Sequence, residues 1–173
     1  MGSIAGDISD NLPIKTNEDA KLFSKKTELS NVDLENFCKK HNLPYNFIEL
    51  KDLDKLNKRY SFVFTGDKKN EFNNGNNKHW LLVDGNLIFD SYGLKSAYKF
   101  PSGFEIVKNH PKQLQEYNST ICGEYCLAFL NFLIQNPNIK NKDLGVEFSD
   151  EYGFTENRRD NDKTISKWYQ ESM

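Results

Sequence analysis

The residues whose types and spacing most favour chemistry in this chain are Cys122, His79, Asp90 and Gln115. Cys122 stands at the start of an apolar stretch that we predict as a helix from Ile121 onward. A cysteine at a helix N-terminus feels the positive end of the helix dipole, which favours the nucleophilic thiolate. A small buried core residue is the alternative interpretation of the same cysteine. The partners of the thiol therefore decide between the two.

His79 and Asp90 lie on two strand-like runs, 79–83 and 86–90, which Asp84-Gly85 separates. An Asp-Gly pair predicts a two-residue hairpin loop. That loop would place His79 directly opposite Asp90, with Cβ atoms about 5 Å apart on one face of the sheet. A carboxylate beside an imidazole can orient a general base and stabilise its protonated form. The alternative is a cross-strand charge pair without a chemical role.

Gln115 precedes the cysteine by seven residues. Its side-chain amide and the backbone N–H of Cys122 could stabilise the oxyanion of a tetrahedral intermediate, where losing one donor typically costs about 3 kcal/mol. Taken alone, Gln115 is an ordinary polar loop residue. Together with the His–Asp pair and the thiol, it completes a constellation suited to thiol acyl-transfer chemistry.

These segments are similar to a known family. The stretches that carry the similarity are His79-Trp80, Phe89-Asp90-Ser91-Tyr92-Gly93 and Gln115 through Cys126. They resemble the adenovirus-type maturation proteases, which belong with the proteases of ubiquitin-like proteins, and most of all those of virophages and Maverick/Polinton elements. Ser30 through Cys38 resembles an N-terminal motif of that subgroup. The likeness runs from about Ser30 to about Leu133.

The resemblance implies a cysteine protease with His79 as base, Asp90 as its orienting acid and Cys122 as nucleophile. Gln115 would contribute to the oxyanion hole. The implied fold is α+β and papain-like, a central mixed β-sheet flanked by helices with the catalytic order His-Asp-Gln-Cys. Adenoviral members carry Glu where this chain has Asp90, and either carboxylate can orient an imidazole. The implied reaction is cleavage of capsid or core precursors after a small residue such as glycine during virion maturation.

Trp80 and Gly123 are the substrate-binding residues that we expect beside these four. The resemblance implies that the Trp80 ring shapes the substrate cleft, whereas its predicted position opposite Phe89 indicates core packing. Three other functions stay open. The first is an isopeptidase of the deubiquitinase or deSUMOylase kind. The second is an acyltransferase that depends on coenzyme A, and the third is a non-enzymatic capsid or scaffold protein.

The composition of the 173 residues, with 37% hydrophobic and 13% aromatic side chains, predicts one globular domain over 1–173. Segment 1–29 is polar, and 138–173 reads as a polar extension packing on the domain. With 23 basic and 25 acidic residues, the chain gives no sign of nucleic-acid binding. No run of about 18 apolar residues predicts a membrane span. We expect a monomer in the virion and the host cytoplasm, within the viral factory.

The other two cysteines are Cys38 and Cys126, and three cysteines in all indicate a reducing compartment. No cysteine lies between His79 and Cys122, so a disulfide-linked activator peptide is not supported, whereas a non-covalent one stays open. Zinc held by Cys122 and Cys126 with His79 or His110 is an alternative. The carboxylate partner of His79 argues against it, and we predict neither a metal nor a cofactor.

Further elements follow from local signals. Ser30 and Asp33 predict a capping box for a helix that turns Val32, Leu34 and Phe37 toward the core. Asn118, Ser119 and Thr120 can cap the cysteine helix, and Pro137 lies just beyond its end. We also predict strands at 60–65 and 104–108, an exposed loop at 66–78, weak helical character at 18–26, and a short terminal amphipathic helix carrying Ile165, Trp168 and Tyr169. Self-trimming at Ile4-Ala5-Gly6-Asp7 is conceivable.

Overall fold

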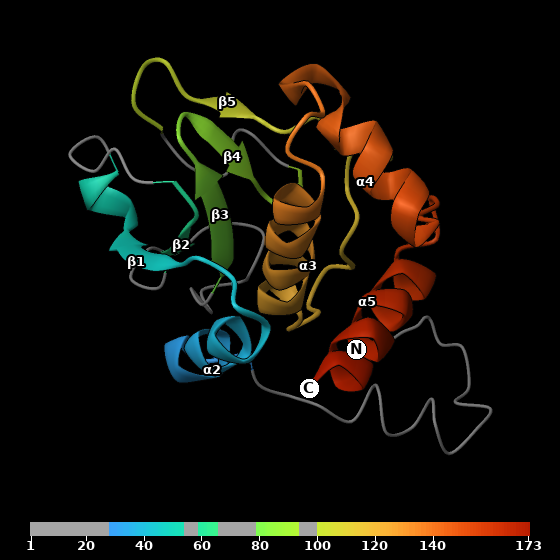
Figure 1. The fold of residues 1–173 in the computed structure, drawn as a ribbon. Coiled ribbons are helices and arrows are strands. Elements are labelled where there is room, and N and C mark those ends of the chain that lie inside the picture. Colours follow the sequence, from blue (N-terminus) through green and yellow to red (C-terminus); the bar gives the residue numbers. More distant parts are fainter. Residues whose placement is uncertain (1–27, 54–58, 66–78, 94–99) are drawn as a thin grey trace.

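The computed structural model describes residues 28–53, 59–65, 79–93 and 100–173. Across these ranges the architecture is α+β, with one five-stranded mixed sheet and four α-helices, which confirms the coarse fold class (Figure 1). The strand order is β1-β2-β3-β4-β5. The two inner pairs that involve β3 are antiparallel, and the outer pairs β1–β2 and β4–β5 are parallel.

The strands are β1 (Asn46–Glu49), β2 (Ser61–Phe64), β3 (Trp80–Asp84), β4 (Leu87–Phe89) and β5 (Glu105–Ile106). The helices are α2 (Asn31–His41), α3 (Cys122–Gln135), α4 (Leu144–Tyr152) and α5 (Arg158–Ser172). Short 3-10 turns occupy Leu50–Asp52 and Asn141–Asp143. Helix α3 contacts both β3 and α5, so it lies between the sheet and the C-terminal helix (Figure 1).

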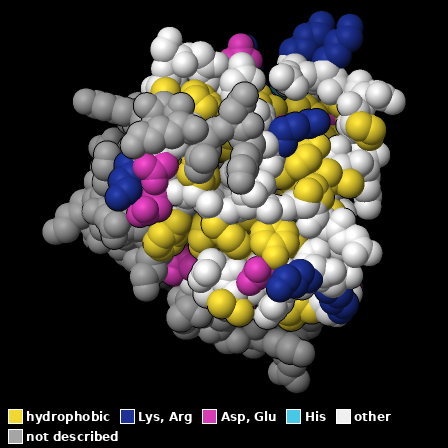
Figure 2. Space-filling model, turned by 60° about the vertical axis from the view of Figure 1, so that its left-hand side comes forward, with side chains coloured by type: hydrophobic (Ala, Val, Ile, Leu, Met, Phe, Trp, Pro, Cys, Tyr) yellow, Lys and Arg dark blue, Asp and Glu magenta, His cyan; other side chains and the backbone are white. Residues whose placement is uncertain are grey.

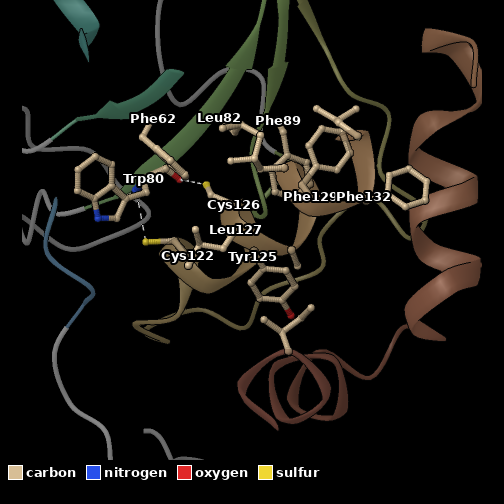
Figure 3. Close-up of a cluster of buried hydrophobic side chains, with 14 of the residues drawn as sticks. Phe62, Trp80, Leu82, Phe89, Cys122, Tyr125, Cys126, Leu127, Phe129 and Phe132 are labelled. Carbon is tan, nitrogen blue, oxygen red and sulfur yellow. Dashed lines mark hydrogen bonds between the residues drawn. The ribbon is translucent and has the colours of Figure 1, made fainter. Parts of the chain in front are cut away.

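Helix α3 begins at Cys122 as predicted and is buried along most of its length, because 11 of its 14 residues are inside the core. Its aromatic face packs on β4, where the rings of Phe89 and Phe129 stack with centroids 4.3 Å apart (Figure 3). The predicted capping by Asn118, Ser119 or Thr120 is wrong. Ile121 is the N-cap and makes no side-chain cap hydrogen bond.

Helix α2 carries the predicted capping box, since Ser30 accepts from the backbone of Asp33 and the Asp33 carboxylate accepts from the backbone of Ser30. Leu34 and Phe37 are buried as expected. Val32 is 53% exposed, which corrects its assignment to the core. It lies two positions before Leu34, and residues two apart point to different sides of a helix.

The β3–β4 hairpin exists, but its predicted register is wrong. Asp84 pairs with Leu87, so the two-residue loop is Gly85-Asn86 instead of Asp84-Gly85. Gly85 adopts a positive φ of 64°, and a glycine in the first central position suits a type II′ hairpin turn. Leu82 therefore faces Phe89, and Trp80 faces Phe64 of β2 instead of Phe89. The shift is of two residues, so every side chain keeps its predicted face.

The strand predicted at 60–65 is β2, and the one predicted at 104–108 is the two-residue β5. Strand β1 and helix α4 were not predicted. The terminal helix is longer than predicted, since α5 has 15 residues and packs against α3. It buries Ile165 and Tyr169 together with the polar residues Asn161, Asp162 and Ser166.

Several expectations lie outside the described residues. They are the loop at 66–78, the weak helix at 18–26, the stretch Ile4–Asp7 and all but the last two residues of the segment 1–29. Where the structure does describe the chain, its helices are too short or too polar to cross a membrane.

Candidate active site

The imidazole of His79 and the carboxylate of Asp90 meet at one end of the β3–β4 hairpin. His79 directly precedes β3 and Asp90 directly follows β4. His79 Nε2–H donates to Asp90 Oδ1 at 2.9 Å, and each residue is only 2% exposed. The observed register makes them diagonal neighbours, which still lie on the same face of the hairpin. The predicted pair is therefore present, although by a different pairing from the one that predicted it.

The chain after Asp90 turns tightly and fixes that carboxylate. The backbone N–H of Tyr92 donates to Asp90 Oδ1 at 2.9 Å, and the Asn109 amide donates to the Asp90 carbonyl at 2.7 Å. Gly93 closes the turn with a φ of +65°, and a Cβ atom there would lie 1.8 Å from the carbonyl oxygen of Lys112. Only glycine satisfies both the positive φ and this close approach.

The His79 ring is held on its face as well as at its edge. Tyr92 stacks on it with ring centroids 4.8 Å apart and an interplanar angle of 29°. Since Nε2 is engaged by Asp90, Nδ1 is the ring nitrogen that remains for proton exchange with a sulfur. Neither Tyr92 nor Asn109 was assigned a role from the sequence. Tyr92 lies inside the noted Asp-Ser-Tyr-Gly stretch, whereas no local signal marks Asn109.

Cys122 lies next to this pair. The residue is 2% exposed, and its sulfur accepts the backbone N–H of Trp80 at 3.3 Å, so it sits beside the residue that follows His79 (Figure 3). The Cys126 thiol donates to the carbonyl of the same Trp80 at 3.4 Å. Helix α3 is thereby attached to the start of β3 by its first and second turns. The structure brings the thiol, the imidazole and the carboxylate together in one buried site.

The protonation of His79 reflects these neighbours. Burial lowers the pKa of His79, but the negative charges of Asp90 and Cys122 and the hydrogen bonds to both outweigh burial and raise the pKa from 6.5 to about 10. An opposite charge within a few ångströms favours the charged form of an imidazole. The site therefore favours a protonated His79, an imidazolium, between the Asp90 carboxylate and the Cys122 sulfur at neutral pH.

Gln115 is fully buried in the segment that precedes Cys122. Its amide nitrogen lies 3.0 Å from the carbonyl oxygen and 3.2 Å from Oγ of Ser119, and its oxygen accepts the hydroxyl of Ser91. The backbone N–H of Gln115 donates to the Ser91 carbonyl at 3.2 Å. Gln115 is thus fixed between the segment after Asp90 and the loop before Cys122. The N–H groups of the Gln115 side chain point at Ser119. An oxyanion would therefore have to share these donors with Ser119.

A groove of about 490 Å³ adjoins Trp80. It is lined by residues at the start of α2, by β1, by the end of β2 and by Trp80, namely Glu28, Leu29, Ser30, Asn31, Phe47, Ile48, Glu49, Phe64 and Trp80. Figure 2 shows hydrophobic side chains gathered on the face on which β1 comes forward, with acidic side chains beside them. Trp80 packs in the core, as its predicted strand position indicated, and it also lines this groove.

Leu29 connects Trp80 with the other expected substrate contact, Gly123. The indole N–H of Trp80 donates to the carbonyl of Leu29 at 2.8 Å. A Cβ atom on Gly123 would lie 3.2 Å from Cβ of Leu29. Leu29 was not singled out from the sequence, and nothing in its surroundings along the chain marks it. Leu29 thus contacts Trp80 and lies against Gly123, the residue that follows Cys122.

The zinc alternative finds no support in the described ranges, which contain no group of three or more His, Cys, Asp or Glu side chains placed to hold a metal ion. His110, one of the two histidines considered as a zinc ligand, is exposed at the surface. Cys126 is buried in the core and directed at a backbone carbonyl.

Comparisons of the chain with protein-family models, curated proteins and solved structures found no match.

Proposed function

We propose that this protein is a cysteine endopeptidase with a papain-like arrangement, in which the catalytic residues follow the order His79, Asp90, Gln115 and Cys122. The observation that carries the proposal is the meeting of the Cys122 sulfur with the buried His79–Asp90 pair. The sequence separates these groups by up to 43 positions. The start of β3, the end of β4 and the start of α3 meet and bring them together. A raised His79 pKa beside the sulfur supports a thiolate–imidazolium pair.

In the first half of the reaction the Cys122 thiolate attacks the scissile carbonyl carbon and forms a C–S bond. The carbonyl oxygen takes the electron pair, and the N–H of Cys122 and the Gln115 amide stabilise its charge. The tetrahedral intermediate then collapses, the C–N bond breaks, and His79 gives its proton to the leaving amine. An acyl-enzyme remains on the sulfur.

In the second half His79, now neutral, takes a proton from water, and the resulting hydroxide attacks the acyl carbon. Collapse of the second tetrahedral intermediate breaks the C–S bond and releases the carboxylic acid. The thiolate and imidazolium are regenerated, so no further reactant is required. Asp90 keeps the ring oriented through Nε2 and stabilises its positive charge throughout.

The substrate class that we propose is the capsid or core precursor polypeptides cut during virion maturation, with a small residue such as glycine before the scissile bond. The similarity of the His-Trp, Asp-Ser-Tyr-Gly and Gln-to-Cys segments to maturation proteases supports the class. The burial of Cys122 and the closeness of Leu29 and Trp80 support the small residue, because a wide side chain would meet these walls. The groove beside Trp80 would hold the residues upstream.

The test is cleavage of a set of glycine-containing fluorogenic peptides by the wild-type chain and by Cys122→Ala. The matched control is Cys126→Ala, which removes a thiol one turn further along the same helix. We expect Cys122→Ala to abolish cleavage and Cys126→Ala to retain it. Undiminished cleavage by Cys122→Ala would end the proposal. Preferential release of a fluorophore from a ubiquitin-like tag would instead favour the isopeptidase.

A further inference from the structure

The first turns of α5 reach the segment that carries Gln115. The side-chain amide of Asn161 donates to the carbonyl of Leu114 at 3.2 Å. The carboxylate of Asp162 accepts the backbone N–H of Glu116, with N···O distances of 3.3 and 3.4 Å. Two consecutive residues of the C-terminal helix therefore hold the peptide groups on either side of Gln115.

Asp162 is buried more deeply than a surface helix residue would be, with 5% of its area exposed. The hydroxyl of Tyr125 in α3 donates to Asp162 Oδ1 at 2.8 Å. Burial raises the pKa of Asp162 well above its usual value, and hydrogen bonds from Tyr125, Ser119 and the Glu116 backbone oppose that rise. Asp162 thus binds the backbone of Glu116, and the nearby Ser119 hydroxyl lowers its pKa. The Gln115 amide donates to the same Ser119.

Capping of α5 does not explain why the Asp162 carboxyl group is buried. Asn157 is the N-cap and accepts the backbone N–H of Asp160 at 3.1 Å, so the helix start is already capped by another side chain. Burying a carboxyl group without compensation is unfavourable, and the apolar residues Ile165 and Tyr169 already attach α5 to the core. The contacts of Asp162 are directed at the Gln115 segment and at the α3 tyrosine beneath it.

We propose that Asp162 is a positioning residue that holds the amide of Gln115 in place for oxyanion stabilisation. Asn161 fixes the preceding peptide group and Asp162 fixes the following one. The backbone of Gln115 itself is bound on the opposite side by Ser91. The C-terminal helix is then part of the active-site support. This inference rests on the proposed function, because an oxyanion forms only in acyl transfer.

The experiment compares Asp162→Asn with Asp160→Asn, the same substitution at an exposed position two residues earlier in the same helix. Both are assayed with a glycine-containing peptide that the wild-type chain cleaves. We expect kcat of Asp162→Asn to fall roughly ten-fold with KM unchanged. The Asn side chain keeps one oxygen for Tyr125 and Glu116, but its NH₂ group cannot accept the Glu116 N–H as the second carboxylate oxygen does, so Gln115 is displaced only in part. Asp160→Asn should match the wild-type chain.

A second comparison separates positioning from general damage. In a Gln115→Ala background, Asp162→Asn should lower kcat little further, because the group that it positions is already gone. The rate at which iodoacetamide alkylates Cys122 should stay within about two-fold of the wild-type rate, as the thiol and its base are untouched. An equal loss in both backgrounds, or alkylation that falls with kcat, would overturn the proposal.

A third measurement does not depend on turnover. The side-chain amide resonances of Gln115 should shift in Asp162→Asn and stay in place in Asp160→Asn. If the wild-type chain cleaves no peptide and Cys122 is unreactive, the proposed function is what fails, and these resonances still decide whether Asp162 positions Gln115. If Asp162→Asn does not fold, Tyr125→Phe removes the hydroxyl that contacts both Asp162 Oδ1 and the Leu114 carbonyl, and it serves in the same assays. Unshifted resonances would refute the proposal.

Discussion

Replacing Asp90 by Asn and by Ala separates the charge of the carboxylate from its geometry. In the folded protein Asp90 Oδ1 accepts two N–H groups, from His79 Nε2 and from the backbone of Tyr92, each at 2.9 Å. The Tyr92 N–H requires an oxygen at that position. An Asn side chain would therefore place its oxygen there and still accept from Nε2–H. The imidazole would keep its orientation and its tautomer.

The loss in Asp90→Asn is then that of the charge alone. A hydrogen bond to a charged group contributes about 1.5–3 kcal/mol and a neutral one about 0.5–1.5 kcal/mol. The difference of about 1.4 kcal/mol corresponds to roughly ten-fold in kcat/KM. Asp90→Ala leaves two buried N–H donors without an acceptor at about 1–3 kcal/mol each. We expect it to lose on the order of 10³-fold in activity and about 2–6 kcal/mol of unfolding free energy.

The assay is the pH profile of kcat/KM on one peptide, with urea denaturation in parallel. Asp90 and Cys122 together raise the His79 pKa to about 10, so activity that needs an imidazolium should fall near that pH in the wild-type chain. Without the Asp90 charge the imidazolium loses its proton more readily, and the alkaline limb of Asp90→Asn should move to lower pH. An Asn variant as inactive as the Ala variant, or an unmoved alkaline limb, would refute this account.

Three further predictions concern the same region. Gly93→Ala should destabilise the fold by more than about 2 kcal/mol in urea, because its Cβ would lie 1.8 Å from the Lys112 carbonyl oxygen at a positive φ. Gly85→Ala is its control, since no atom lies within 4 Å at a similar φ, and equal losses would contradict the steric explanation. The His79 contribution to stability should be fully present below pH 6.5 and be lost as the pH rises through about 10, because its pKa is raised on folding. Thermal melts of the wild-type chain and His79→Gln would show this, and identical alkaline slopes would count against it. Iodoacetamide should modify Cys122 before Cys38 in the native protein, because burial raises the pKa of the Cys38 thiol to about 12. Mass spectrometry of the peptides would reveal the order, and equal modification would be inconsistent with it.

The elements that carry the candidate site could be predicted because their signals are local. The capping box of α2, the unbroken apolar run of α3 and a glycine turn between two apolar strands each depend on a few neighbouring residues. The juxtaposition of His79 and Asp90 survived a wrong register, because Asp84-Gly85 and Gly85-Asn86 are both acceptable loops. Choosing between them shifts the pairing by two residues and leaves the side-chain faces unchanged.

The supports of the site could not be predicted, because they depend on contacts between distant segments. Asn161 and Asp162 belong to a stretch whose polar composition indicated a surface extension. Their burial becomes visible only when α5 lies on α3 and meets the Gln115 segment. Asn109 has the same character, since its amide binds a carbonyl 19 positions earlier in the chain. Polar residues buried by tertiary contacts leave no periodic pattern in a sequence.

The two sulfur contacts of the Trp80 peptide group have a mechanical consequence. Its N–H meets Cys122 and its carbonyl meets Cys126, one helical turn apart. Because one peptide group makes both contacts, it fixes the position of α3 along the helix axis. Any movement of α3 along that axis would break both contacts at once. The spacing of Cys122 and His79 therefore depends on the main chain of Trp80 and on the two cysteine sulfurs. The indole ring of Trp80 takes part in neither contact, so replacing it by another ring should leave the spacing of the proposed nucleophile and base unchanged.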